Sequence, residues 1–291
     1  MYFNLKISSI LFIHTLSLSI SVDSCFPAKQ ENTITTDSIE SGKEKITSSS
    51  HQQEKNQTMT NDSKENNASF DIDYIMGKFD PASHPDFVTI PLIYADQEGR
   101  MMRKDAFSAF VSMYDAAQKE GIKLKIVSAT RNFVNQKSIW ERKWNGSTIL
   151  EGGLNATTIK DFKKRALKIL EYSSMPGSSR HHWGTDLDLN ELENGYFASG
   201  QGKKIYDWLV KHGHEYGYCQ VYTAKGKERP NGYNEEKWHW SYTPVSSRLM
   251  ELAKNALTNE MISGFDGAET ASEIDIVHKY VLGISPLCGN K

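Results

Sequence analysis

Neither sign of charge is in excess in this sequence. Its 291 residues contain 34 Lys and Arg against 36 Asp and Glu, which gives a formal net charge of -2 at pH 7. A protein that binds nucleic acid through its phosphates presents a strongly basic patch or stripe. The balanced composition gives no sign of such a patch, so we expect no nucleic-acid partner.

A hydrophobic run long enough to span a membrane is also missing. The most apolar stretch extends from Ile7 to about Ile20 and is interrupted by His14 and several serines. Such a stretch, preceded by Lys6, is too short for a comfortable transmembrane helix and is typical of an export signal. We therefore expect residues 1–25 to form a signal peptide and the protein to reach the periplasm or cell envelope.

Cysteine is scarce, with three in the whole chain. Val22-Asp23-Ser24-Cys25 resembles a bacterial lipobox, although Asp23 departs from the usual small or apolar residue. Cys25 is therefore a candidate site for lipid attachment to a membrane, and a plain cleaved signal peptide is the alternative. Cys219 and Cys288 remain as an even pair, which in an oxidising compartment forms either a disulfide or two buried thiols. Neither has a partner at metal-ligand spacing.

Apolar residues nearly vanish between residues 26 and 69, where Ser, Thr, Asn, Gln, Lys and Glu dominate. A segment of this composition cannot bury enough apolar surface to offset the entropy that it loses on ordering. We expect a disordered polar tether here, followed by one folded domain over residues 70–291. The sequence contains no internal repeat, and we expect a monomer.

Helical and strand patterns alternate in the folded part. Apolar residues at helical spacing predict helices over residues 103–120, 138–144, 157–171, 203–211, 246–257 and, more weakly, 274–282. Period-two alternation predicts strands over residues 122–128, 186–189, 218–222 and 238–242. In the helix over residues 157–171, we expect Phe162 and Leu167 to face the core.

Residues 178–190 combine two histidines and two aspartates around a single glycine. In a strand, side chains alternate between the two faces of the sheet. Leu187 and Leu189 then enter the core, while Asp186 and Asp188 line a cleft. Buried carboxylates beside a histidine such as His181 need a compensating partner, and a metal ion is the usual one.

A second group of candidate residues lies in Glu236-Lys237-Trp238-His239-Trp240. If both tryptophans anchor a strand in the core, His239 faces the cleft. His181, Asp188 and His239 then form a three-ligand set that leaves a fourth position for water, as in catalytic zinc sites. Glu236 is placed to act on that water, provided that the strand begins after it or bulges there. Satisfied core histidines and ordinary His–Asp hydrogen bonds are the alternatives.

Arg131 follows closely on the strand predicted over residues 122–128, at a position where loops commonly build sites. Its guanidinium is able to bind a carboxylate through two parallel hydrogen bonds. A surface arginine without a ligand is the alternative.

Three motifs together resemble the zinc D-alanyl-D-alanine carboxypeptidases of the VanY type, which belong with lysostaphin-like enzymes and the hedgehog signalling domain to the LAS group. Ser179-Arg180-His181-His182-Trp183-Gly184-Thr185-Asp186-Leu187-Asp188 is similar to their S-x-H-x-x-G-x-A-x-D motif. Glu236-Lys237-Trp238-His239-Trp240 is similar to E-x-W-H-W. Ser128-Ala129-Thr130-Arg131, followed by Gln136, is similar to S-G-Y-R-x-x-x-x-Q. The motifs occur in family order, and the resemblance covers roughly residues 103–257.

The resemblance implies an α+β fold in which helices flank a small antiparallel sheet and a zinc site lies in a central cleft. It implies that Zn2+ is bound by His181, Asp188 and His239, with Glu236 as the catalytic base. Arg131 is implied as a catalytic residue that contacts the substrate or the transition state. The substrate-binding residues implied by the motifs are Arg131, Gln136 and Ser179.

Two residues of the first motif need a separate interpretation. Asp186 replaces the family's small alanine and shares a face with Asp188, so we expect it to orient a ligand or Arg180, or else to narrow the site. His182 has no role in the motif, and we expect it at the surface or behind a ligand.

The activity that the resemblance implies is zinc-dependent hydrolysis of peptidoglycan stem peptides ending in D-alanyl-D-alanine. An L,D-carboxypeptidase or endopeptidase acting on the same polymer is one alternative. A non-catalytic cell-wall-binding or signalling module of the same fold is another. Because the three ligands, the base and the arginine are all present, the sequence favours the enzyme.

Overall fold

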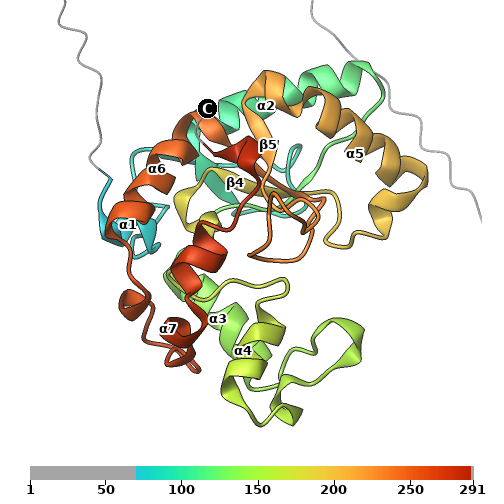
Figure 1. Cartoon of the computed structure of the whole chain (residues 1–291). Coiled ribbons are helices and arrows are strands. Elements are labelled where there is room, and N and C mark those ends of the chain that lie inside the picture. Colours follow the sequence, from blue (N-terminus) through green and yellow to red (C-terminus); the bar gives the residue numbers. More distant parts are fainter. Residues whose placement is uncertain (1–69, 290–291) are drawn as a thin grey trace, which may run out of the picture. The chain divides into compact units, whose positions relative to one another are not determined.

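The computed structural model describes residues 70–289, which Figure 1 shows as a coloured ribbon. These residues belong to one compact unit. The signal peptide predicted over residues 1–25, the tether over residues 26–69 and the lipid attachment site at Cys25 lie outside the described residues. Within residues 70–289, no helix combines the length and the apolar character that crossing a membrane requires.

The fold is α+β, as the sequence predicted, with short strands set between helices. The helices are α1 (Ile72–Ile75), α2 (Lys104–Lys119), α3 (Phe133–Trp144), α4 (Phe162–Ile169), α5 (Gly200–His212), α6 (Thr243–Ala256) and α7 (Thr270–Ile274). The strands are β1 (Phe87–Thr89), β2 (Met101–Arg103), β3 (Ile126–Ser128), β4 (Asp186–Leu189), β5 (Tyr218–Gln220) and β6 (His239–Tyr242).

The central sheet has four antiparallel strands in the order β3-β4-β6-β5, and β1 pairs with β2 in a separate sheet. Across β4 and β6, Asp188 lies opposite His239 and Leu187 lies opposite Trp240. The alternation predicted for β4 is therefore confirmed. All four residues of β4 are buried, so its polar face points into the protein rather than into solvent.

An irregularity in β3 brings a further polar residue to the face of β4 that carries the aspartates. Ile126 lies opposite Leu189, and a regular ladder would then place Val127 opposite Asp188. Instead Ser128 lies opposite Asp188, because β3 contains one extra residue between the two pairs. Such a bulge re-aims the side chains that follow it. Ser128 and the chain after it consequently face the polar side of the sheet.

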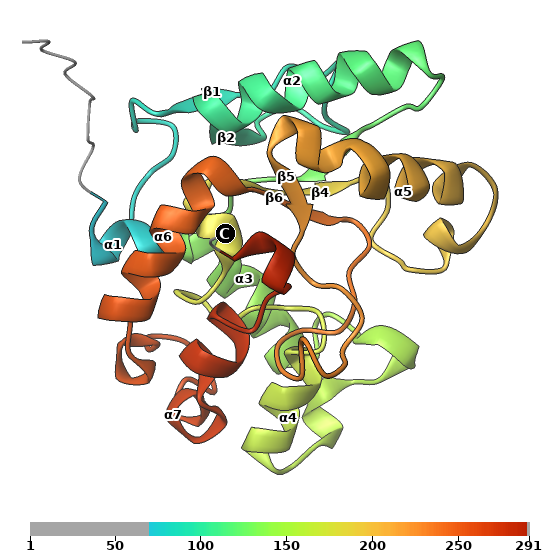
Figure 2. The ribbon, with the colours of Figure 1, turned by 45° about the horizontal axis from the view of Figure 1, so that its top comes forward.

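Helices cover both sides of this sheet. Figure 2 shows α2 and α5 on one side, and α3, α4 and α7 on the other. The first side is apolar, since Leu187, Leu189 and Trp240 pack there with buried residues of α2 and α5 in one hydrophobic cluster. A second cluster joins α3, α4, α6 and α7. The polar face of β4 and β6 is therefore the face of the sheet that is turned toward this second group of helices.

A disulfide between Cys219 of β5 and Cys288 ties the C-terminal segment to the edge of the sheet. The two Cα atoms are 5.7 Å apart. The disulfide, rather than the pair of free thiols, is therefore the form that the structure contains. Close to it, the Ser285 amide donates to the Val221 carbonyl over 2.8 Å, so this segment is held to the end of β5 by two kinds of link.

The helix predicted over residues 157–171 is shorter, and part of its orientation was predicted wrongly. Asp161 caps it by accepting a hydrogen bond from the Lys164 amide over 3.0 Å, so α4 begins at Phe162. Phe162 is 50% exposed and Leu167 is 39% exposed, whereas Ala166 is buried. α4 packs against α3 and α7 through a stripe that contains Arg165, Ala166 and Ile169, and this leaves Phe162 and Leu167 nearer its outer side.

Candidate functional site

His181, Asp188 and His239 come together from three separate elements. His181 lies in the 3₁₀ turn Arg180–Trp183, directly before β4, while Asp188 and His239 are cross-strand neighbours on β4 and β6. All three are buried, and one ligand atom from each lies within 4.8 Å of the others. The structure thus assembles the predicted three-residue set around one point.

Contacts with a backbone carbonyl and with Asp186 hold one ring nitrogen of each histidine and direct the other nitrogen at this point. His181 Nδ1 is 2.8 Å from the Ala129 carbonyl oxygen, which has to accept a proton, so Nε2 is left facing Asp188 at 3.4 Å. His239 Nε2 is 2.9 Å from Asp186 Oδ2, which leaves Nδ1 facing Asp188 at 3.4 Å. Metal-binding histidines characteristically donate their other N–H to a carbonyl or carboxylate in this way.

The residues fit a divalent metal ion. Asp188 Oδ1 is buried and makes no hydrogen bond within the described part of the chain, and a buried carboxylate oxygen without a partner is costly. Burial alone would raise the pKa of Asp188, but His181, His239 and Arg131 lower it to about 2, so the group is an anion. Two imidazole nitrogens and one carboxylate oxygen are ligands typical of zinc.

The metal-free cluster holds a proton on His239. Burial lowers the pKa of this ring, yet hydrogen bonds to Asp186 and Glu236 and the charge of Asp188 raise it to about 9. A metal ion that binds Nδ1 would therefore displace a proton at neutral pH.

Asp186 lies beneath the cluster and contacts both residues that we expected it to orient. Its Oδ2 accepts from Arg180 Nε over 2.9 Å and faces His239 Nε2. Its Oδ1 accepts from the hydroxyls of Ser241 and Thr185 over 2.6 and 2.8 Å. Although burial opposes ionisation, Arg180, His239 and Ser241 hold the pKa of Asp186 well below its usual range. Asp186 therefore supports His239 and does not narrow the cleft.

Glu236 lies in the turn that leads into β6. Its carbonyl accepts a hydrogen bond from the His239 amide, and β6 begins at His239. The strand thus starts after Glu236, and both side chains face the same way, with Glu236 Oε2 at 3.2 Å from His239 Nδ1. Burial, together with the charge of Asp188, raises the pKa of Glu236, although His239 and Arg131 act in the opposite direction. A carboxylate whose pKa is raised toward neutrality is suited to general-base catalysis.

Arg131 reaches the site through the irregularity in β3. Its Nη1 donates to the Ser128 hydroxyl over 2.7 Å and lies 3.8 Å from Asp188 Oδ2. Its Nε donates to Gln136 Oε1 over 3.0 Å, and Gln136 Nε2 in turn donates to the Ser174 carbonyl over 2.8 Å. Both predicted residues therefore lie beside the candidate ligands, and Arg131 is not a free surface residue.

Ser179 and His182, the two other residues of the first motif that we singled out, do not line the cavity. Ser179 is buried, and its hydroxyl has no hydrogen-bond partner among the described residues, but it is not among the residues that line the cavity. Its substrate-binding role stays a prediction. His182 is fully buried, so a surface position is wrong. Its Nδ1 is 2.6 Å from the Arg131 carbonyl and its Nε2 accepts from the Gly177 amide over 3.0 Å, so it joins two backbone segments of the site.

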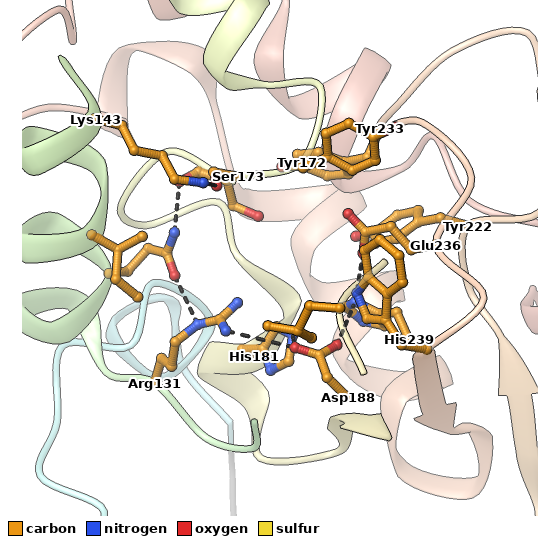
Figure 3. A pocket seen from close by; sticks show the side chains of 15 residues that line it. Arg131, Lys143, Tyr172, Ser173, His181, Asp188, Tyr222, Tyr233, Glu236 and His239 are labelled. Carbon is orange, nitrogen blue, oxygen red and sulfur yellow. Dashed lines mark hydrogen bonds and ion pairs between the residues drawn. The ribbon is translucent and has the colours of Figure 1, made fainter. Parts of the chain in front are cut away.

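A cavity of about 270 Å³ lies over the cluster, and most of its wall was missed by the sequence interpretation (Figure 3). It includes Arg131, Gln136, Glu236 and all three candidate ligands. The wall also contains Lys143, Tyr172, Ser173, Tyr222 and Tyr233. Nothing in the local sequence around these five residues distinguishes them from core or surface positions, because they come from separate loops and from α3.

Comparison with known proteins agrees with this geometry. The family model described as "VanY: D-alanyl-D-alanine carboxypeptidase" matches residues 99–245, which contain the cluster, Glu236 and Arg131. The chain belongs to this family. The matched part extends from just before β2 to the start of α6, so the C-terminal helices and the segment with Cys288 lie beyond it.

A curated relative is "Putative carboxypeptidase YodJ" of Bacillus subtilis (strain 168), which is 30% identical over 166 residues. These cover 55% of this chain and 53% of the relative, so the chain spans about half the length of that protein. The solved LdcB LD-carboxypeptidase is 23% identical, with a TM-score of 0.43 over 70% of this chain and 81% of that one. VanYB in complex with D-alanine-D-alanine is 19% identical, with a TM-score of 0.43 over 60% of this chain and 87% of that one.

Proposed function

We propose that this protein is a zinc-dependent D-alanyl-D-alanine carboxypeptidase that acts on peptidoglycan stem peptides. The observation that carries the proposal is the convergence of His181, Asp188 and His239 on one point, with Glu236 beside them in a cavity. Family membership supports the reaction class, and the name of the family supports the substrate. The set of two histidines and one carboxylate supports zinc as the ion.

Each residue has a defined task in this proposal. A bound divalent ion lowers the pKa of water and polarises a carbonyl group. Glu236 takes the proton of the attacking water and passes it to the leaving amine. Arg131, which Ser128 and Gln136 hold next to Asp188, stabilises the negative charge that develops on the scissile carbonyl oxygen. Asp186 keeps the proton on Nε2 of His239, so that Nδ1 stays available to the ion.

The cellular location that we propose follows from the N-terminal sequence alone. An export signal over residues 1–25 and a polar tether over residues 26–69 would deliver the domain to the compartment that holds peptidoglycan. Attachment of lipid at Cys25 would keep it at a membrane. Radiolabelled palmitate incorporated by the wild-type protein but not by Cys25→Ala would support attachment, and equal incorporation would contradict it.

The decisive test of the function is the substitution Glu236→Gln. It keeps the size of the side chain and removes the base, so turnover should fall by about 100- to 10,000-fold while bound zinc stays near one ion per chain by elemental analysis. Mass spectrometry of the products from defined stem peptides, with and without the terminal D-alanine, distinguishes D,D-carboxypeptidase from L,D-carboxypeptidase and endopeptidase cleavage. A zinc-free wild-type protein, or unchanged turnover in the variant, would rule the proposal out.

A further inference from the structure

Lys143 is a cation in the cavity wall that the proposed reaction does not use. It lies on α3, seven residues after Gln136, so the two side chains share one face of the helix, with Ile139 between them. All three line the cavity. In Figure 3, Lys143 lies across the cavity from Asp188 and His239. It also lines the adjoining groove next to Leu150 and Glu193, so it stands where the cavity continues into that groove.

The ammonium of Lys143 has no carboxylate partner among residues 70–289. Its one hydrogen bond is donated to the hydroxyl of Ser173, and no Asp or Glu oxygen of the described residues lies within 4.0 Å of it. Other lysines do have such partners, as Lys137 does in Glu141 and Lys168 does in Glu171. Burial, and then the charge of Arg131, lower the pKa of Lys143, while the more distant charges of Glu236 and Glu151 act in the opposite direction. A half-buried ammonium without a counter-ion is unfavourable unless a ligand supplies one.

The charges of the cavity also favour an anionic ligand. Two permanent cations in the wall, Arg131 and Lys143, face two carboxylates, Asp188 and Glu236. These charges balance once His239 has lost its proton to become a ligand and before the charge of the ion is counted. A divalent ion bound to the cluster leaves the cavity with a positive surplus, and a ligand that carries a carboxylate would offset it.

We propose that Lys143 is a substrate-binding residue whose ammonium pairs with a carboxylate of the peptide substrate, and this rests on the proposed peptidase function. Arg131 is committed to the neighbourhood of Asp188 by its contacts with Ser128 and Gln136. Lys143 is therefore the cation available for a charge farther along the peptide. The carboxylate belongs either to the C-terminal residue that is released or to a side chain on the other side of the scissile bond.

Two peptide modifications and one substitution test the proposal. Peptides ending in D-alanyl-D-alanine are prepared with an internal glutamate, with glutamine in its place, and with an amidated C-terminus. Calorimetry measures their binding to two zinc-loaded proteins, Glu236→Ala and the double variant that also carries Lys143→Met. Neither protein consumes the peptides. Lys143→Met should weaken binding of the unmodified peptide by about 10- to 100-fold, since a hydrogen bond to a charged group is lost. The peptide that lacks the recognised carboxylate should bind both proteins equally.

The pattern of losses identifies the carboxylate. An effect that disappears with glutamine assigns Lys143 to the internal carboxylate, and one that disappears with the C-terminal amide assigns it to the released residue. Equal weakening of all three peptides, or no weakening, overturns the proposal.

Matched variants separate binding from folding. Lys137→Met, on the same helix but paired with Glu141 outside the cavity, should leave binding unchanged. Lys143→Arg should retain more affinity than Lys143→Met because it keeps the charge. If the wild-type protein cleaves none of the peptides, the proposed function is wrong, and the proposed role of Lys143 in binding a peptide carboxylate is overturned with it. If the wild-type protein cleaves the peptides normally, but the unmodified peptide binds Glu236→Ala protein equally with and without Lys143→Met, only the role of Lys143 is overturned and the proposed function stands.

Discussion

The two aspartates of β4 lie two residues apart on one face of one strand, yet their surroundings differ. Both oxygens of Asp186 accept hydrogen bonds, from Arg180, Ser241, Thr185 and His239. Asp188 faces the cavity, and its Oδ1 makes no hydrogen bond among the described residues. At one end of the strand, Asp186 belongs to a closed network in which both of its oxygens accept hydrogen bonds. At the other, open end, Asp188 has an oxygen that accepts none.

This difference separates a carboxylate that supports its neighbours from one that is suited to bind an ion. A buried carboxylate with all of its hydrogen bonds satisfied has no capacity left for a ligand. A buried carboxylate that has an oxygen without a hydrogen bond, and that faces one ring nitrogen of each of two histidines, has that capacity. The closed network at Asp186 holds the ring of His239 in place, and in the function that we propose the ion binds at Asp188. Substitutions at the two ends should therefore have opposite effects. A substitution at Asp188 should lower zinc affinity and turnover more, and a substitution at Asp186 should lower the free energy of unfolding more.

The largest expected effect follows from Asp188→Ala. It removes one of three proposed ligands, which for zinc would share a binding free energy of roughly 10–16 kcal/mol, so zinc affinity should fall by on the order of 1,000-fold and turnover should be lost. The far-ultraviolet circular dichroism spectrum should stay unchanged, since the contacts that are lost, with Arg131 and His181, join side chains and not backbone elements. Competition with a fluorescent zinc chelator measures the affinity. Zinc affinity within tenfold of wild type would show that Asp188 is not a ligand.

Asp186→Asn should produce the opposite profile. An asparagine has one acceptor oxygen where Asp186 has two, and it leaves the buried Arg180 without its counter-ion. Breaking a buried ion pair of this kind costs about 3–5 kcal/mol of unfolding free energy, and losing the partner of a metal-binding histidine costs about 10- to 100-fold in metal affinity. Urea unfolding and the chelator competition measure the two losses.

A surface ion pair supplies the control for Asp186. Asp96 accepts from Arg100 over 2.5 Å, but it is partly exposed to solvent. Asp96→Asn should cost less than about 1 kcal/mol, as surface pairs usually do. If both variants unfold at the same urea concentration, the network around Asp186 is not the structural support that we describe.

Much of this contrast could be predicted from the sequence, because alternation in a strand is a local property. The period-two pattern of residues 186–189 placed Leu187 and Leu189 in the core and both aspartates on the other face, and β4 has that arrangement. The motif with Glu236 and His239 likewise required a strand that begins after Glu236 or bulges there, and β6 begins at His239, which is the first of these two arrangements.

The rest depends on long-range contacts that no local pattern records. The extra residue in β3, which turns Ser128 toward Asp188, appears only when β3 pairs with β4. Of the two positions that the sequence allows for His182, the surface one is wrong, because the ring is buried against the backbone of Arg131, 51 residues away in sequence. Lys143 reads as an ordinary charged residue of a helix, and only the packing of α3 beside Ser173 brings it to the cavity wall.

The smallest expected effect tests the edge of the closed network. The Ser241 hydroxyl donates to Asp186 and accepts from Arg180 Nη2 over 2.8 Å. Ser241→Ala removes these two bonds and the contact with Ser246, but it leaves the ion pair between Asp186 and Arg180 intact. The free energy of unfolding should therefore fall by about 1–3 kcal/mol. Zinc affinity should change by less than about tenfold, because His239 keeps its contact with Asp186. Ser246→Ala is the matched control, since its hydroxyl contacts Ser241 at 3.0 Å but not Asp186. A loss of zinc affinity as large as that of Asp186→Asn would show that the hydroxyl, rather than the carboxylate charge, orients His239.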